Sequence, residues 1–373
     1  MAKENVFTKA ELVKMWKRPV ERQYNVAISK ILEAISNTDG QISICFSGGK
    51  DSSLLLDMYC EQYAQIGDYK DRPIGVYFAN TTNETRAMLS FIKSYIPWVE
   101  NKWGVKIDFN EVRPENGLTW AAFIKDNGIP LISKEQAKFI RVVRRDVEKI
   151  GCDLSTLYKY HRGGMAAVNA LFDMGFSKTA VLNLTGYVSS RQTFGEGFIL
   201  SKIWLPMVYC PVPISEQCCV NIKEKPLARI TNAMIMTGEQ AAESRMRENV
   251  YLKTGCNVRL ADGSYKSKPF GAMTADGVLF ALQYRKTPIC SDYGSIIKDE
   301  TGHYRCTKAD RTGCALCGFG CQYDTDRFIR LSEEEPAKTK FAFTPREKGG
   351  AGYGEAIEYM NEYCGTDVKI PKL

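Results

Sequence analysis

The sequence predicts an α/β protein built around a parallel β-sheet. Two observations carry this prediction: short apolar segments alternate with longer amphipathic ones between residues 7 and 109, and a glycine-rich loop follows the first short segment. This alternation is typical of βαβ units, in which a helix joins two parallel strands. A chain of 373 residues suffices for one large domain or two modest ones.

The elements follow in order from the spacing of apolar side chains. Residues 7–36 place them at helical intervals with charges between, which predicts an amphipathic helix or a pair of helices. Three strands and the two helices between them are then predicted at 41–46 (strand), 52–63 (helix), 73–78 (strand), 85–98 (helix) and 105–109 (strand).

Residues 112–212 fit this alternation less well. They contain a basic segment of helical character at 138–145 and the adjacent glycines Gly163 and Gly164. We expect a helical insertion over the edge of the sheet. The predicted organisation is an N-terminal helical segment (1–36), a main domain (37–270, with the insertion at 112–212), a cysteine-rich segment (271–330) and a tail (331–373).

Composition narrows the class of protein. No apolar run approaches the roughly 20 residues that cross a bilayer, and the stretch from Met1 to Asn5 lacks a signal-peptide core. A cytoplasmic protein without membrane contact is therefore expected. The formal net charge of +7 permits a polyanionic partner without requiring one. Thirteen cysteines and two histidines, in a reducing compartment, favour thiolate-bound metal over disulfides.

The loop after the first strand has the composition of a phosphate-binding site. Gly48 and Gly49 let the backbone approach an anion closely, and the helix that follows directs free N–H groups toward it. Lys50 adds a positive charge, and hydroxyl groups come from Ser47, Ser52 and Ser53. The spacing differs from a Walker A loop, which has four residues between its glycines. A glycine turn with serine caps is the purely structural alternative.

Residues 47–52 resemble the PP-loop signature Ser-Gly-Gly-Xaa-Asp-Ser of the adenine nucleotide α-hydrolase superfamily. The resemblance implies a Rossmann-like domain that binds ATP, cleaves it between the α and β phosphates and releases pyrophosphate. Mg²⁺ would accompany the nucleotide, with Asp51 either contacting the metal or capping the helix. The segment after the second strand lies where the superfamily lines its nucleotide pocket, so the candidate nucleotide contacts there are Asn80, Thr81 and Glu84. A polar helix cap is the alternative for this segment.

Four cysteines form two closely spaced pairs, Cys218–Cys219 and Cys314–Cys317. Together they supply four thiolates, enough for a [4Fe–4S] cluster or a structural zinc ion. Neighbouring side chains tend to diverge, which makes the adjacent pair awkward for tetrahedral zinc. Thiols without a metal are the remaining alternative. Two further cysteines flank the second pair and could replace a ligand: Cys306 and Cys321.

The order of the cysteine motifs resembles the iron–sulfur members of the sulfonucleotide reductase family. That family includes adenylylsulfate (APS) and phosphoadenylylsulfate (PAPS) reductases and related DNA phosphorothioation enzymes. Residues 238–247 resemble its Gly-x-Arg-x-x-Glu-Ser-x-x-Arg motif, with Gln240 in place of the first arginine. The resemblance covers about residues 40–325, and Tyr293-Gly294 also follows the family's order. It implies nucleotide contacts from Glu243, Ser244, Arg247 and Lys268.

Three functions are compatible with these motifs. An ATP-using enzyme would adenylate an acceptor and transfer sulfur with a [4Fe–4S] cluster, with Lys50, Asp51 and Arg247 at the reacting phosphates. A sulfonucleotide reductase would bind PAPS or APS and use a cysteine nucleophile, for which Cys364 before Gly365 is the candidate, although no histidine follows it. A nucleotide-binding accessory protein would show no turnover. The intact ATP-type loop favours the first function.

The two enzymatic functions imply partners besides the adenine nucleotide. A sulfur donor or a thiol reductant protein is required, and nucleic acid is one candidate acceptor. The oligomeric state stays open, with a dimer among the alternatives. Basic side chains that could contact a nucleic-acid backbone, or form a solvated face instead, are Arg141, Arg144, Arg145, Lys149 and Arg162, with Lys14, Lys17, Arg18 and Arg22 near the N-terminus.

Overall fold

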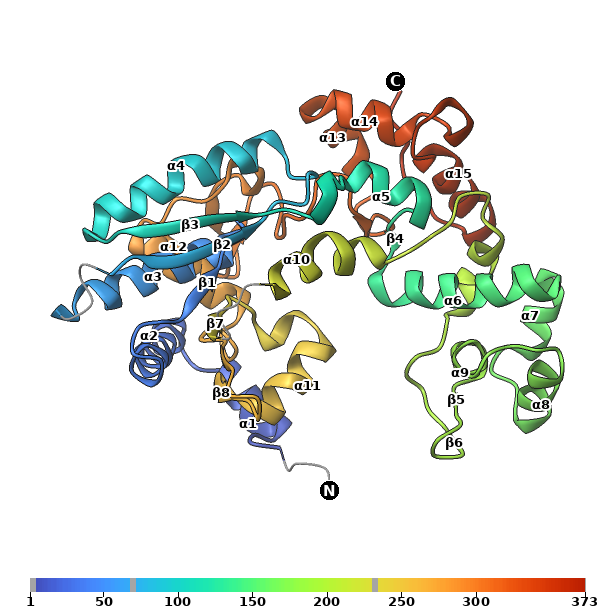
Figure 1. Ribbon diagram of the computed structural model, residues 1–373, viewed down its shortest axis with the longest axis horizontal. Helices are drawn as coiled ribbons and strands as arrows, with labels where there is room; N and C mark the ends of the chain where they lie inside the picture. The colour runs from blue at the N-terminus through green and yellow to red at the C-terminus, as the bar shows by residue number, and fades with distance from the viewer. Residues whose placement is uncertain (1–4, 68–71, 230–233, 373) are drawn as a thin grey trace. The chain divides into compact units, whose positions relative to one another are not determined.

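The computed structural model describes residues 5–67, 72–229 and 234–372, and Figure 1 traces the chain through its elements. Two compact units divide it. Unit 1 consists of Met1–Asn80, Glu84–Arg113 and Pro226–Gly313, and unit 2 of Thr81–Asn83, Pro114–Lys225 and Cys314–Leu373. Each unit therefore brings together segments that are far apart in the sequence.

A six-stranded sheet with the order β3-β2-β1-β7-β9-β8 forms the centre of unit 1. Five of its strands are parallel, and β8 runs antiparallel to its neighbour β9. The mixed α/β class with a parallel sheet is confirmed, and the three predicted strands are β1, β2 and β3. The strands lie at Ser43–Cys45 (β1), Ile74–Ala79 (β2), Ile107–Val112 (β3), Met234–Met236 (β7), Asn257–Arg259 (β8) and Tyr265–Ser267 (β9).

Helices pack against this sheet in the βαβ pattern that the sequence predicts. The helix or pair of helices predicted at 7–36 is a pair: α1 ends before Pro19, which cannot continue a helix and lies at the N-cap of α2. The apolar side chains of β1 and of the helix after the phosphate loop, among them Ile44 and Leu55, are fully buried in one core. The unit's helices are α1 (Lys9–Trp16), α2 (Val20–Asn37), α3 (Lys50–Ala64), α4 (Arg86–Trp103), α11 (Arg245–Thr254) and α12 (Ala275–Arg285).

Shorter elements complete unit 1. Two 3₁₀ turns lie at Ala241–Glu243 (η5) and Ser291–Tyr293 (η6), and strands Ile296–Lys298 (β10) and Tyr304–Cys306 (β11) form an antiparallel hairpin. The short helix α10 (Lys225–Ala228) begins at the last residue of a unit 2 segment.

A buried carboxylate, Asp57 of α3, joins three helices of unit 1. It accepts hydrogen bonds from Lys102 Nζ (2.9 Å) and Trp103 Nε1 (2.7 Å) of α4. On its other side, Arg285 Nε of α12 lies 2.8 Å away, and Thr287 Oγ1 also donates to it. Burial raises the pKa of Asp57, but the hydrogen bonds and charge of Arg285 and its neighbours outweigh it, so the pKa lies below its ordinary value.

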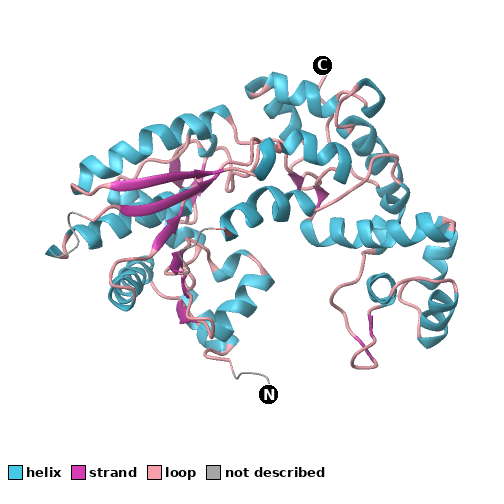
Figure 2. Ribbon diagram, in the orientation of Figure 1, coloured by secondary structure: helices cyan, strands magenta, loops and turns pink. Residues whose placement is uncertain are grey.

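Unit 2 is mainly helical, as Figure 2 shows for the elements from α5 to α9 and from α13 to α15. Residues 331–373, predicted as a tail, instead contribute to its core, where Tyr353 and Ile357 are fully buried. The helices are α5 (Trp120–Asn127), α6 (Lys134–Ile150), α7 (Leu154–Tyr160), α8 (Met165–Asp173), α9 (Lys178–Thr185), α13 (Arg327–Glu334), α14 (Pro336–Phe343) and α15 (Tyr353–Cys364).

The remaining elements of unit 2 are short. Strands β4 and β12 pair in parallel, β5 and β6 form a hairpin, and a π-helical turn follows Cys218. Their bounds are Glu115–Gly117 (η2), Leu131–Ile132 (β4), Tyr187–Val188 (β5), Thr193–Phe194 (β6), Lys202–Tyr209 (η3), Cys219–Glu224 (η4), Gly318–Phe319 (β12) and Arg346–Lys348 (η7).

Residues 81–83 tie distant parts of unit 2 together. Thr82 Oγ1 accepts a hydrogen bond from the Trp120 N–H (2.8 Å). The Asn83 carbonyl accepts one from the Ala315 N–H (2.6 Å), and Asn83 Oδ1 accepts one from the Leu316 N–H (3.3 Å). This three-residue excursion therefore fixes the start of α5 and the turn between Cys314 and Cys317.

Within the described residues, no helix combines the length and apolarity needed to cross a membrane. The first four residues, which entered the prediction that no signal peptide is present, lie outside that part of the chain.

Candidate nucleotide site and cysteine pocket

The phosphate loop, Ser47–Lys50, joins β1 directly to α3 in unit 1. Gly48 has φ +73°, and a side chain there would overlap Met88 and Ile92 of α4, so glycine is required. Ser52 Oγ accepts from the Ser47 N–H (3.1 Å) and donates to the Gly49 carbonyl (2.9 Å). The serine hydroxyls thus hold the loop in shape.

Free N–H groups remain in this loop. The Gly49 N–H donates to Ser47 Oγ (3.3 Å), but no described residue accepts from the N–H groups of Gly48, Asp51 or Ser52. Asp51 and Ser52 occupy the second and third positions of α3, where a helix leaves its N–H groups unpaired. Ser53 is fully buried, and its hydroxyl has no partner among the described residues. The loop therefore retains several donors for an anion.

Asp51 is held between two side chains. Its Oδ2 lies 3.1 Å from Lys50 Nζ, and its Oδ1 accepts from Gln240 Nε2 at 2.7 Å. It does not cap the helix, because the residue before α3 is Gly49 and the cap carries no side-chain hydrogen bond. Gly238 allows this approach, since a Cβ there would lie 2.9 Å from the Asp51 carbonyl oxygen. The segment after β7 thus packs against the first turn of α3.

The predicted nucleotide residues after β7 all have partners within unit 1. Glu243 forms ion pairs with Arg247 and with Arg311, whose Nη2 lies 3.1 Å from it. Lys268 Nζ lies 2.6 Å from Glu239 Oε2. Glu243 also accepts from the backbone of Gln240, which links this group to Asp51 and the loop. Ser244 serves as the N-cap of α11.

The predicted nucleotide-binding residues after β2 belong to different units. Asn80 belongs to unit 1, where its Nδ2 donates to Glu111 Oε1 (2.9 Å), and Glu84 is buried in the same unit. Thr81 belongs to unit 2, with its hydroxyl 3.5 Å from Cys314 Sγ. The structure therefore assigns Thr81 to the cysteines.

Tyr293 contacts the phosphate loop and was given no role from the sequence. Its buried hydroxyl accepts hydrogen bonds from the Lys50 N–H (3.1 Å) and from Thr312 Oγ1 (2.7 Å). Lys50 Nζ lies 5.6 Å from the centre of the Tyr293 ring. In the sequence, the one signal that pointed to this residue was that Tyr293-Gly294 follows the order of motifs in the resembled family.

The four predicted cysteine ligands line one pocket of unit 2. A turn in which the Cys317 N–H donates to the Cys314 carbonyl (3.0 Å) brings these two together, and the π-helical turn presents Cys219 next to Cys218. The other lining residues are Thr81, Trp120, Pro130, Ile222 and Lys223. Cys321 is buried elsewhere in the unit and Cys306 lies on β11 of unit 1, so neither alternative ligand lines the pocket.

The electrostatics of the pocket favour a thiolate at Cys219. A hydrogen bond from Cys218, with smaller contributions from Lys134 and Lys223, lowers the pKa of Cys219 below its ordinary value. The same shared hydrogen bond raises the pKa of Cys218. Burial raises the pKa of Cys317 to about 11. Lys134, at the first turn of α6, was not predicted, and its ammonium group interacts with the Cys219 thiol.

The four cysteines that line this pocket are the donor set for the predicted metal group. Among the described residues, no group of three or more Cys, His, Asp or Glu side chains is placed to hold one ion. A cubane cluster binds each thiolate to a different iron, so its four ligands surround a larger volume. Asn83 Nδ2 is buried beside the Cys314–Cys317 turn and has no partner among the described residues. Such a donor suits a sulfur-rich group.

Cys364 ends α15 and lies in the core of unit 2. Its exposure is 4%, and burial, together with Cys210, raises its pKa to about 12. Both facts oppose a thiolate at neutral pH. Its role as a nucleophile stays a prediction without structural support.

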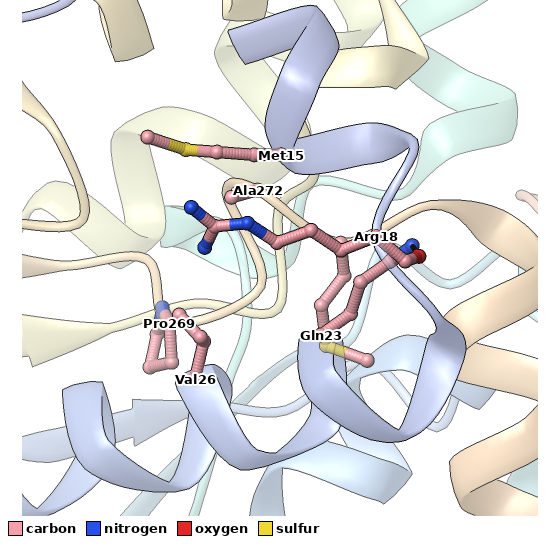
Figure 3. Close-up of a pocket in the computed structure, with 7 residues that line it drawn as sticks. Met15, Arg18, Gln23, Val26, Pro269 and Ala272 are labelled. Carbon is pink, nitrogen blue, oxygen red and sulfur yellow. Dashed lines mark hydrogen bonds between the residues drawn. The ribbon is translucent and has the colours of Figure 1, made fainter. Parts of the chain in front are cut away.

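Four of the nine predicted basic contacts are paired with acidic side chains. Arg141 forms two hydrogen bonds with Glu216, and Arg144 pairs with Glu148. Similar pairs join Arg145 to Asp146 and Arg162 to Glu196. Arg18 instead extends between Met15 and Pro269 in a small pocket of unit 1 (Figure 3).

No protein-family model matches the sequence, and no curated protein matches it. Among solved structures, the chain is similar to the phosphoadenylyl-sulfate (PAPS) reductase from Candida auris in its phosphate complex. The two are 10% identical with a TM-score of 0.35, and the match covers 80% of this chain and 99% of that one.

Proposed function

We propose that the protein is an ATP-using enzyme that adenylates an acceptor, releases pyrophosphate and transfers sulfur with the aid of a [4Fe–4S] cluster. One observation carries the nucleotide part: the unpaired N–H groups of Asp51 and Ser52 at the start of α3, beside the buried ammonium group of Lys50. This arrangement is suited to phosphate oxygens. The resemblance of residues 47–52 to a PP-loop supports ATP as the nucleotide.

The residues of the loop support attack at the α-phosphate. An acceptor oxygen forms a bond to the α-phosphorus while the bond to the β,γ-pyrophosphate breaks. Lys50 stabilises the negative charge that develops on the leaving pyrophosphate. Asp51 would contact Mg²⁺ through the carboxylate that now pairs with Lys50, and Arg247 would move from Glu243 to a phosphate oxygen. In the second step a sulfide-level donor displaces AMP, which leaves with the acceptor oxygen.

The cysteine pocket would hold the cluster. Cys218, Cys219, Cys314 and Cys317 would each ligate one iron, and the bound cluster would supply a site for sulfur or for electrons. Lys134 and Lys223 would offset its negative charge. A nucleic-acid acceptor is not part of this proposal, because Arg141, Arg144, Arg145 and Arg162 are engaged in ion pairs.

The first experiment is anaerobic purification with iron and sulfide analysis, followed by binding of ATP and PAPS in parallel. We expect about four irons per chain, as one cubane cluster requires, together with preference for ATP and ATP-dependent pyrophosphate release. The variant Cys219→Ser should lose the iron, whereas Cys60→Ser, a buried thiol of unit 1, should keep it. Absence of iron in the wild type would contradict the cluster, and preference for PAPS with thiol-dependent sulfite release would establish a reductase instead.

The variant Cys364→Ser separates the two activities. A reductase that attacks with this cysteine loses its activity, whereas a sulfur-transfer enzyme does not need it. We expect unchanged pyrophosphate release and iron content, because the thiol is buried and its pKa is raised to about 12. Steady-state rates on the anaerobic protein provide the measurement. A complete loss of activity with normal folding, judged by circular dichroism, would assign the nucleophile to Cys364.

A further inference from the structure

The phosphate loop has a donor that its sequence signature does not contain. The hydroxyl of Tyr293 is buried, with 2% of the residue exposed, and both hydrogen bonds to it are accepted ones. The Lys50 N–H and the Thr312 hydroxyl occupy the two lone pairs of the oxygen. The phenol proton itself has no acceptor among the described residues. A buried donor without an acceptor costs free energy, so an acceptor is expected when the site is filled.

The position of this hydroxyl relates it to the phosphate donors. Lys50 is the first residue of α3, and its N–H is taken by Tyr293. The next two N–H groups, of Asp51 and Ser52, are the free ones. A Cβ on Gly49 would lie 3.2 Å from the Tyr293 hydroxyl, so the phenol reaches the loop backbone itself. An anion bound by these N–H groups therefore meets the phenol proton next to them.

We infer that Tyr293 is a phosphate-binding residue of this site and that it donates its proton to a phosphate oxygen of the nucleotide. The inference rests on the proposed function, because it assumes that the loop binds a nucleotide phosphate. Thr312 acts through Tyr293: its hydrogen bond fixes the phenol oxygen and leaves the proton free to face the loop. Lys50 and Asp51 are the charged groups that act on the phenol.

The test compares the binding of three probes, ATP, inorganic pyrophosphate and adenosine, by isothermal titration calorimetry. Tyr293→Phe should weaken the binding of ATP and of pyrophosphate by about 10- to 100-fold, the usual effect of losing one hydrogen bond to a charged group. The affinity for adenosine should stay unchanged. The matched control is Tyr265→Phe, another buried tyrosine of unit 1, whose hydroxyl accepts from Asn37 Nδ2 (3.0 Å). This control should bind all three probes normally.

A second variant keeps the test decisive if Tyr293→Phe folds poorly. Thr312→Val should weaken the binding of ATP by about 2- to 10-fold, as expected for the loss of a neutral hydrogen bond. The double variant should bind no more weakly than Tyr293→Phe alone, because Thr312 acts through the missing hydroxyl. Independent, additive effects would overturn the role given to Thr312.

Replacing Tyr293 by 3,5-difluorotyrosine distinguishes a donor from a structural contact. Burial raises the pKa of Tyr293, so the wild-type phenol stays protonated at neutral and mildly alkaline pH. The fluorinated phenol ionises at lower pH; its phenolate cannot donate and repels phosphate, whereas it still accepts from Lys50. ATP binding should therefore fall with rising pH only in the fluorinated protein. A wild type that binds neither ATP nor pyrophosphate would overturn the proposed function, whereas ATP binding unaffected by Tyr293→Phe would overturn this inference alone.

Discussion

Replacing Lys50 by methionine is expected to slow pyrophosphate release by about 100- to 1,000-fold, the effect of removing one group that stabilises charge in a transition state. The ammonium group is buried, with 5% of the residue exposed, and its side chain is held beside Asp51 and over the Tyr293 ring. It is therefore directed to the loop before any nucleotide arrives. Single-turnover release of pyrophosphate from ATP measures the effect.

Two further variants serve as controls for Lys50→Met: one keeps the positive charge at position 50, and the other removes a positive charge at another position of unit 1. Lys30→Met deletes a lysine whose partner is Glu33 at the surface of the same unit, and it should leave the rate unchanged. Lys50→Arg should not restore activity, because the planar guanidinium group is larger than an ammonium group and does not fit the same buried position. A normal rate in Lys50→Met would remove Lys50 from the reaction.

Asp57→Asn is expected to lower the free energy of unfolding by about 3–5 kcal/mol, the usual cost of breaking a buried ion pair on one side. Arg285, with 4% of its side chain exposed, would keep Glu61 as its only carboxylate partner among the described residues. Helices α3, α4 and α12 would lose their common contact. For a unit of this size the midpoint of thermal unfolding should fall by roughly 6–20 °C.

The same carboxylate predicts how stability depends on pH. Because the folded pKa of Asp57 is lower than its unfolded one, its contribution is fully present above the ordinary aspartate pKa of about 3.9 and is lost as pH falls further. The wild type should thus lose stability on acidification, and Asp57→Asn should lose less over the same range. Urea titrations at several pH values between neutral and acidic provide the test.

Glu33→Gln serves as the comparison for Asp57. It breaks a pair with Lys30 in which both side chains are more than a third exposed, and such pairs contribute about 0–1 kcal/mol. If Asp57→Asn were no more destabilising than this surface variant, the buried network would not stabilise unit 1.

The features that could be predicted from the sequence are those encoded locally. The glycines, serines and Lys50 of the loop are neighbours in the chain, and the periodicity around them predicts a strand before and a helix after. The two cysteine pairs were likewise visible, since each pair is compact in sequence.

The partners of these residues could not be predicted, because they come from distant positions. Tyr293 is 243 positions away from Lys50, and Cys314 is 233 positions away from Thr81. The association of residues 314–373 with 114–225 is of the same kind, since apolar spacing reveals that Tyr353 is buried but not against which segment. The partners of Asp57 are equally distant, since they lie on two other helices.

The excursion of residues 81–83 into unit 2 has a consequence for how the chain folds. Asn83 binds backbone groups of Ala315 and Leu316, and Leu316 is synthesised 233 residues after it. Unit 2 therefore cannot complete its core until the segment Cys314–Leu373 has left the ribosome. Contacts of such long range slow folding and leave apolar surface exposed meanwhile. We expect a nascent chain that ends at residue 313 to need chaperone protection although it already contains every segment of unit 1.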